Sequence, residues 1–78
     1  MGEKATDIAA RLRKSLKDLG TECQYMKAQI ASEALPNTAD KAEMVANTML
    51  AYRHLEDARM RLGKVIQAYD GGVSVYDK

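Results

Sequence analysis

The fold is decided by residues 51–72, which read AYRHLEDARMRLGKVIQAYDGG. Apolar side chains recur along this stretch at steps of three and four residues, apart from one gap: Tyr52, Leu55, Leu62, Ile66 and Tyr69. This spacing is typical of a helix that packs along another helix. Arg59 fills the gap, and Gly63 follows one turn later. The stretch therefore predicts a seam between two helices that carries a cation.

Arg59 needs a partner in such a seam, because a guanidinium is costly to remove from water unless it is paired. Glu56, one turn earlier, could form a structural ion pair with it. A phosphate could also serve, since arginine donates two parallel hydrogen bonds to phosphate oxygens. The residues leave both interpretations open.

A second apolar row precedes this stretch. It consists of Ile8, Leu12, Leu16, Leu19, Cys23, Met26 and Ile30. Its steps of three and four predict one long helix over about residues 5–34. Gly20, in the middle of the row, favours a bend or a close crossing with another element. We interpret Cys23 as a small buried residue, because an isolated cysteine without a basic partner is rarely a nucleophile.

Pro36 separates the two apolar patterns, because it cannot continue a helix and disfavours helical backbone at Leu35. We expect a turn at residues 35–38, with Asn37 or Thr38 capping the next helix. A connection this short returns the second helix antiparallel to the first.

The second helix is expected over about residues 39–70. Gly71 or Gly72 can end it, which leaves residues 71–78 as a short extended tail. The predicted fold is therefore all-α, with residues 1–78 forming a single antiparallel helical hairpin.

The composition limits the classes of function. The chain has 78 residues, of which 12 are basic and 11 acidic, and a formal net charge of +1. A near-neutral chain is poorly suited to non-specific DNA or RNA binding. No apolar run approaches the roughly 20 residues that span a bilayer, and one cysteine without an apolar leader suits a reducing cytoplasm.

Association is expected as well, because a two-helix chain gains most of its burial by oligomerising. The outward-facing apolar residues Leu50, Met60 and Val65 would then meet another copy of the chain.

The chain offers little for catalysis. It contains no glycine-rich phosphate loop, no nucleophile elbow, no cysteine and histidine cluster with zinc spacing and no carboxylate pair in a catalytic setting. His54 stands off the seam and is interpreted as a surface or subunit-contact residue. We expect no enzyme activity, no metal and no cofactor.

A basic face lies opposite the first apolar row. It carries Arg11, Arg13, Lys14 and Lys17. Such a run is usually a solvated surface, but cations near a helix N-terminus oppose the helix dipole, so a nearby anion would stabilise them. Both interpretations remain open.

Two segments resemble a known family. They are LEDARMRLGKVIQ at residues 55–67 and DGGVSVYD at residues 70–77. Together they resemble the C-terminal hairpin helix of the phage anti-CBASS cyclic-oligonucleotide sponges and the related anti-Thoeris sponges. The resemblance covers roughly residues 51–78, and residues 1–40 share only the hairpin form.

The resemblance implies a compact homohexamer in the cytoplasm of an infected bacterium. Such proteins bind cyclic di- or trinucleotide immune signals, and in related proteins cyclic ADP-ribose isomers, and hold them without cleavage. Pockets between subunits place aromatic side chains against bases and basic groups on phosphates. On this basis Arg59 is expected at a phosphate, Arg61 and Lys64 as supporting cations, and Tyr52 or Tyr69 at a base.

Two other functions are compatible with the residues. The chain could be a structural or adaptor hairpin that binds a protein partner through helix packing. In that case Glu56 should fully satisfy Arg59, with no enclosed basic pocket. It could also be a small nucleic-acid-binding module that uses its basic face, although the net charge speaks against this.

Overall fold

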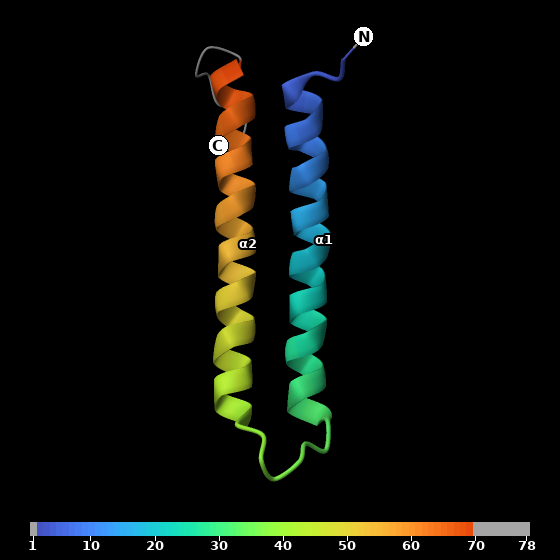
Figure 1. The fold of residues 1–78 in the computed structure, drawn as a ribbon, viewed down its shortest axis with the longest axis vertical. Helices are drawn as coiled ribbons and strands as arrows, with labels where there is room; N and C mark the ends of the chain where they lie inside the picture. Colours follow the sequence, from blue (N-terminus) through green and yellow to red (C-terminus); the bar gives the residue numbers. More distant parts are fainter. Residues whose placement is uncertain (1, 70–78) are drawn as a thin grey trace.

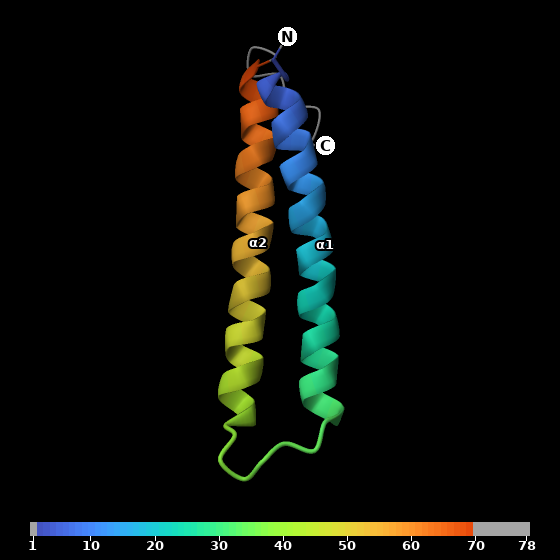
Figure 2. The ribbon, with the colours of Figure 1, turned by 45° about the vertical axis from the view of Figure 1, so that its right-hand side comes forward.

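The computed structural model describes residues 2–69, which form two long helices side by side (Figure 1). Helix α1 spans Ala5–Ser32 and helix α2 spans Lys41–Tyr69, against expected ranges of about 5–34 and 39–70. The start of α1 and the end of α2 lie at the same end of the molecule, and a second view shows that they stay adjacent along their length (Figure 2). The predicted all-helical hairpin is confirmed, with no strand in the described part of the chain.

The loop between the helices begins before Pro36. Helix α1 ends at Ser32, and the backbone at Glu33 is already extended, with ψ of 145°. The amide of Glu33 still donates to the carbonyl of Gln29 at 2.9 Å, which completes the last turn. The amide of Ala39 donates to the carbonyl of Pro36 at 2.9 Å, so the chain reverses direction just after the proline.

Asp40 caps helix α2. Its Oδ1 accepts a hydrogen bond from the amide of Glu43 at 3.0 Å. The expectation that Asn37 or Thr38 would act as the cap is therefore wrong. Because α2 begins at Lys41 and not at residue 39, the residue placed to accept from the first turn is Asp40. The end of the chain that was expected to hold the glycine cap and the tail lies outside the described residues.

Two glycines lie at contacts between the helices. Gly20 is buried against Tyr52, and a Cβ at Gly20 would lie 3.3 Å from Cε2 of the tyrosine ring. Such a contact is tighter than ordinary packing, so the ring occupies the space that a side chain would fill. Of the two roles considered for Gly20, the close crossing is confirmed.

The apolar row expected to face α2 is only partly buried. The residues of α1 that do face the seam are buried or half-buried: Ala9, Arg13, Leu16, Gly20, Cys23, Lys27 and Ile30. The other members of the predicted row remain exposed: Ile8 at 37%, Leu12 at 45%, Leu19 at 51% and Met26 at 45%. Apolar residues on this helix cover more of its circumference than one neighbouring helix can bury.

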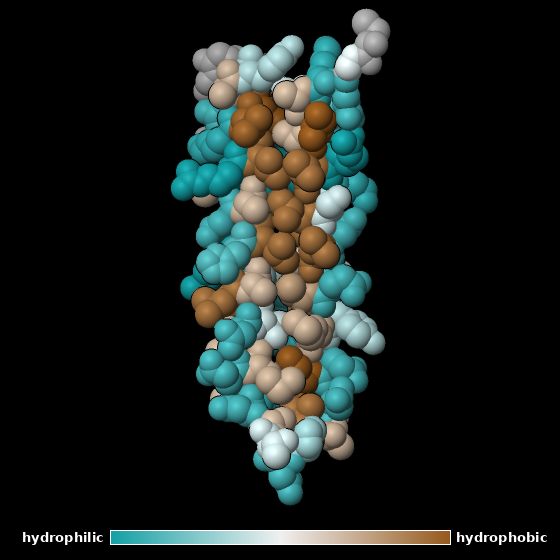
Figure 3. All heavy atoms as spheres, viewed as in Figure 1, coloured by the Kyte–Doolittle hydropathy of each residue, from teal (hydrophilic) through white to brown (hydrophobic). Residues whose placement is uncertain are grey.

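An apolar band consequently remains on the surface. Figure 3 shows hydrophobic side chains of both helices gathered along one face of the hairpin. Apart from this band, Leu50, Met60 and Val65, which were expected to face outward, are about half exposed, at 48%, 49% and 47%. No large side chain among residues 2–69 is fully buried. The hairpin alone therefore has a thin core, made of small and medium-sized residues between its two helices.

Candidate anion-binding site

Two arginines from opposite helices meet in the seam. Nε of Arg13, on α1, donates a hydrogen bond to the backbone carbonyl of Arg59, on α2, at 3.1 Å. Both residues are half-buried. A seam between two helices normally holds apolar side chains, and two like charges placed close together repel each other. The local packing therefore concentrates positive charge where it is most costly.

The register of the hairpin explains why these two residues face each other. Arg13 precedes Gly20 by seven residues, and Arg59 follows Tyr52 by seven. Since the helices are antiparallel and Gly20 contacts Tyr52, two turns further along the seam Arg13 lies level with Arg59. The sequence of each helix thus fixes the meeting of the two cations.

Gly63 lies beside the Arg13 guanidinium. It is buried, and a Cβ at this position would lie 3.6 Å from Cζ of Arg13, at ordinary van der Waals distance. The guanidinium therefore lies close to the backbone of α2, one turn beyond Arg59. An alanine would fit here, so this contact does not by itself require a glycine.

A pocket opens beside the two arginines. It has a volume of about 250 Å³, and we call it the basic pocket. Its lining consists of Arg13, Glu56, Arg59, Met60, Gly63, Lys64 and Gln67. Three of these side chains are cations and one is a carboxylate, so the pocket favours an anion.

A second pocket of about 170 Å³ adjoins the first, and we call it the tyrosine pocket. Its lining consists of Leu16, Lys17, Gly20, Thr21, Gln24, Tyr52, Leu55, Glu56 and Arg59. Glu56 and Arg59 line both pockets, so the two volumes are neighbours along one side of the seam. An anionic group in the basic pocket would have an aromatic and hydrogen-bonding surface next to it.

Arg59 is incompletely satisfied. Its Nε atom is buried and has no hydrogen-bond acceptor within residues 2–69. No ion pair joins Arg59 to Glu56 in this part of the chain, although both line the same two pockets. A buried donor without an acceptor costs about 1–3 kcal/mol. Of the two partners considered for Arg59 from the sequence, Glu56 does not fill that role in the hairpin.

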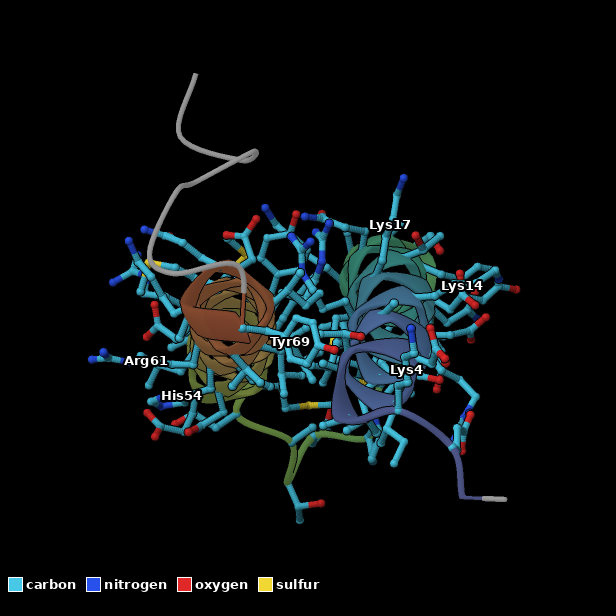
Figure 4. The ribbon with its side chains drawn as sticks, turned by 90° about the horizontal axis from the view of Figure 1, so that it is seen from above. Lys4, Lys14, Lys17, His54, Arg61 and Tyr69 are labelled. Atoms are coloured by element: carbon cyan, nitrogen blue, oxygen red, sulfur yellow. The ribbon has the colours of Figure 1, made fainter. Side chains whose placement is uncertain are left out.

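The structure brings together some of the residues expected at the site. Arg59 and Lys64 line the basic pocket, and Tyr52 lines the tyrosine pocket. Arg61 points away from α1 on the outer side of α2 (Figure 4). Tyr69 extends from α2 toward α1 near the end of the hairpin, is 64% exposed and lines neither pocket (Figure 4).

The basic face expected on α1 is divided among separate partners. Arg11 forms a hydrogen-bonded ion pair with Glu3, and Nζ of Lys14 lies 3.2 Å from Oδ2 of Asp18. The hydrogen bond from Arg11 holds the pKa of the exposed Glu3 carboxyl below its ordinary value. This pair is therefore present at neutral pH and is lost as the pH falls through the lowered pKa.

The remaining two cations of that face reach the pockets. Arg13 lies in the seam, and Lys17 lines the tyrosine pocket. Lys14 points outward from α1, whereas Lys17 leaves the helix on a different side (Figure 4). The face therefore does not act as one continuous positive surface.

Arg13 was expected on the basic face opposite the apolar row, and its place in the seam beside Arg59 is what the sequence reasoning missed. A signal for it exists in the sequence, because Ala9, Leu16, Cys23 and Ile30 recur every seven residues. Arg13 falls three residues before Leu16 and so belongs to the same seam. The apolar but exposed residues Ile8 and Leu12 suggested a seam rotated toward the exposed flank.

His54 and Cys23 lie outside the two pockets. His54 is exposed and points away from α1, and Cys23 is half-buried and unbridged (Figure 4). No group of three or more potential metal ligands occurs within residues 2–69. Neither α1 nor α2 combines the length and the apolar character needed to cross a bilayer.

Comparisons with known proteins add no assignment. Protein families, curated proteins and solved structures yield no match to this chain. The proposals for its function accordingly rest on the residues, on the geometry of the hairpin and on the resemblance in the sequence of its C-terminal third.

Proposed function

We propose that the chain binds a cyclic oligonucleotide and sequesters it without cleavage. The observation that carries the proposal is Arg59, whose buried Nε lacks an acceptor within the described residues and lies beside a pocket that Arg13 and Lys64 also line. A phosphate would supply that acceptor. Arginine recognises phosphate oxygens through paired, charge-assisted hydrogen bonds.

The adjoining tyrosine pocket supports a nucleotide over a simple inorganic anion. The ring of Tyr52 and the side chain of Leu55 offer apolar surface, while Thr21 and Gln24 offer hydrogen-bonding groups. Aromatic stacking and a few polar groups are the usual means of holding a base. A phosphate in the basic pocket and a base in the tyrosine pocket would both contact Arg59.

A cyclic oligonucleotide fits the charge of the chain better than a nucleic-acid polymer does. The formal net charge is only +1, and two cations of the basic face are paired within their own helix or its N-terminal extension. A polymer would need a long positive surface, whereas a compact ligand with two or three phosphates needs only a concentrated one. Symmetric copies of Arg59 around such a ligand would supply one cation for each phosphate.

The proposal includes assembly and cellular setting. Together with the sequence resemblance, it describes a phage anti-defence protein that acts as a homohexamer in the cytoplasm of the infected bacterium and withholds the immune signal from host effectors. The exposed apolar band supports association, because it leaves large side chains in water unless another chain covers them. Arg61 and Tyr69, which lie away from the two pockets, would serve only if assembly brings them to a ligand.

A second candidate function follows from the same band. A structural or adaptor hairpin would place this surface against a protein partner. That interpretation predicts an Arg59 satisfied by Glu56 and no enclosed basic pocket. The buried Nε of Arg59, which Glu56 does not satisfy within the described residues, therefore favours ligand binding.

Retention and recovery of the ligand would test the proposed function. The purified chain, in molar excess, is incubated separately with cyclic di-AMP, cyclic di-GMP and cyclic tri-AMP and then passed through an ultrafilter. We expect at least one of these compounds to disappear from the filtrate and to return chemically unchanged after heat denaturation, as judged by chromatography. Linear products would show that the chain is an enzyme, and full recovery in the first filtrate would exclude sequestration of these three ligands.

A further inference from the structure

One contact in the seam has no evident role in packing. The Nε–H group of Arg13 donates to the backbone carbonyl of Arg59 at 3.1 Å, within the α2 helix. In an α-helix that carbonyl also accepts from the amide four residues later, which belongs to Gly63. A carbonyl oxygen has two lone pairs and can accept both hydrogen bonds. The side chain of Arg13 is therefore hydrogen-bonded to the turn of α2 that carries Arg59.

The Arg13 guanidinium lies beside Gly63. Cζ of Arg13 lies 3.6 Å from the place where a Cβ of Gly63 would be, and Nε lies 3.7 Å from it. The planar group thus lies against the helix backbone, between Arg59 and the next turn. Lysine could supply a charge at this point, but it has neither the planar fork nor the Nε donor.

We propose that Arg13 is a positioning residue for the anion site and acts through Arg59. Its Nε–H hydrogen bond to the Arg59 carbonyl and the packing of its guanidinium beside Gly63 hold this turn of α2, so that the guanidinium of Arg59 stays on the side of the seam where both pockets open. The role of Arg13 in ligand binding rests on the proposed function. The ordering of Arg59 by Arg13 is a property of the ligand-free hairpin and does not depend on that function. A pre-oriented guanidinium loses less conformational entropy when it binds a phosphate.

A double-mutant cycle would test the action through Arg59. Affinity for the cyclic nucleotide that the wild-type chain retains is measured for Arg13→Gln, Arg59→Gln and the double variant. We expect Arg13→Gln to weaken binding about tenfold in the wild-type background and less than about twofold in the Arg59→Gln background. Two effects that simply multiply would overturn the proposal, because Arg13 would then contact the ligand independently.

A conservative replacement separates positioning from charge. Arg13→Lys keeps the charge, so a purely electrostatic role predicts wild-type affinity, whereas positioning predicts a loss similar to that of Arg13→Gln. Arg53→Gln is the matched control, because Arg53 is exposed on α2 and lines neither pocket, and it should leave affinity unchanged. Circular dichroism verifies that each variant retains its helices, and full affinity of a folded Arg13→Lys variant would contradict the proposal.

A ligand-free measurement makes the inference independent of the proposed function. In nitrogen-15 NMR spectra of arginine side chains, the wild-type Arg13 Nε–H should exchange slowly with water, and the Arg59 Nε–H should be a sharp, resolved signal. In folded Arg13→Lys the Arg59 signal should shift toward that of a solvent-exposed arginine and exchange at least about tenfold faster. An unchanged Arg59 signal would overturn positioning even if cyclic nucleotides bind. Failure of the wild type to bind any cyclic nucleotide would instead reject the proposed function.

Discussion

Arg59→Ala is expected to weaken binding of the cyclic nucleotide by about 1.5–3 kcal/mol, or roughly 10- to 150-fold, while the oligomer persists. The loss is large because a buried guanidinium would donate charge-assisted hydrogen bonds to phosphate. Assembly should survive, since an arginine is costly to bury and an alanine in the seam leaves no unpaired donor. Calorimetric titration and analytical ultracentrifugation of the same variant measure the two effects.

Loss of assembly in Arg59→Ala would instead indicate that Arg59 has a structural role. If Arg59 pairs with Glu56 across or within subunits, its removal leaves a carboxylate without its partner and should break the assembly. The hairpin itself contains no such ion pair among its described residues. Arg53→Ala serves as the control, because Arg53 is exposed on α2, lines neither pocket, and should change neither affinity nor assembly. Intact assembly with unchanged affinity in Arg59→Ala would remove Arg59 from the site.

Leu19→Glu is expected to abolish assembly and most of the helix content. Leu19 is 51% exposed on the apolar band of α1, and burying a carboxylate in an interface there would cost several kcal/mol. The separated hairpins should then unfold, because no large side chain among residues 2–69 is fully buried and two helices alone supply too little core. Sedimentation velocity and circular dichroism at micromolar concentration measure both changes.

The matched control for this substitution is Ala28→Glu. Ala28 is also exposed on α1, but it is not a large apolar residue of the band. This variant should remain assembled and helical. A folded monomeric wild type, or a Leu19→Glu variant that assembles normally, would show that the apolar band is not an interface between copies.

The hairpin could be predicted from the sequence because its signals are local. Two apolar rows with helical spacing and one proline between them define the number of helices and their order. The exact cap could not be predicted as well, because Asn37, Thr38 and Asp40 are all suitable residue types. Only the backbone position, directly before Lys41, selects Asp40.

The orientation of the first helix was harder to predict. Its larger apolar residues, such as Leu12 and Leu19, suggested the face that packs against the partner helix. The seam instead uses the seven-residue repeat of Ala9, Leu16, Cys23 and Ile30, and it places Gly20 against Tyr52. Hydrophobicity alone could not distinguish the two faces, because apolar residues lie both on the face that is buried within the hairpin and on the one that is exposed.

Some residues of the site could be predicted from their own helix, whereas others depend on contacts between residues far apart in the sequence. Arg59 could be recognised within its own helix, because it interrupts a regular apolar row. Arg13 could not be assigned in the same way, because its role depends on the antiparallel register that brings residues 46 positions apart into contact. Once Arg59 is assigned to the site, Lys64 and Tyr52 can be assigned to it as well, because they lie on the same helix and line the two pockets.

Isothermal titration of the wild-type chain tests the central claim most directly. The panel consists of cyclic di-AMP, cyclic di-GMP, cyclic tri-AMP and cyclic ADP-ribose isomers, with the linear dinucleotide pApA as the matched comparison. We predict that at least one cyclic compound binds with a Kd of about 1 μM or lower and that pApA binds at least about tenfold more weakly. No heat of binding from any cyclic compound at protein concentrations of about 100 μM would contradict the account.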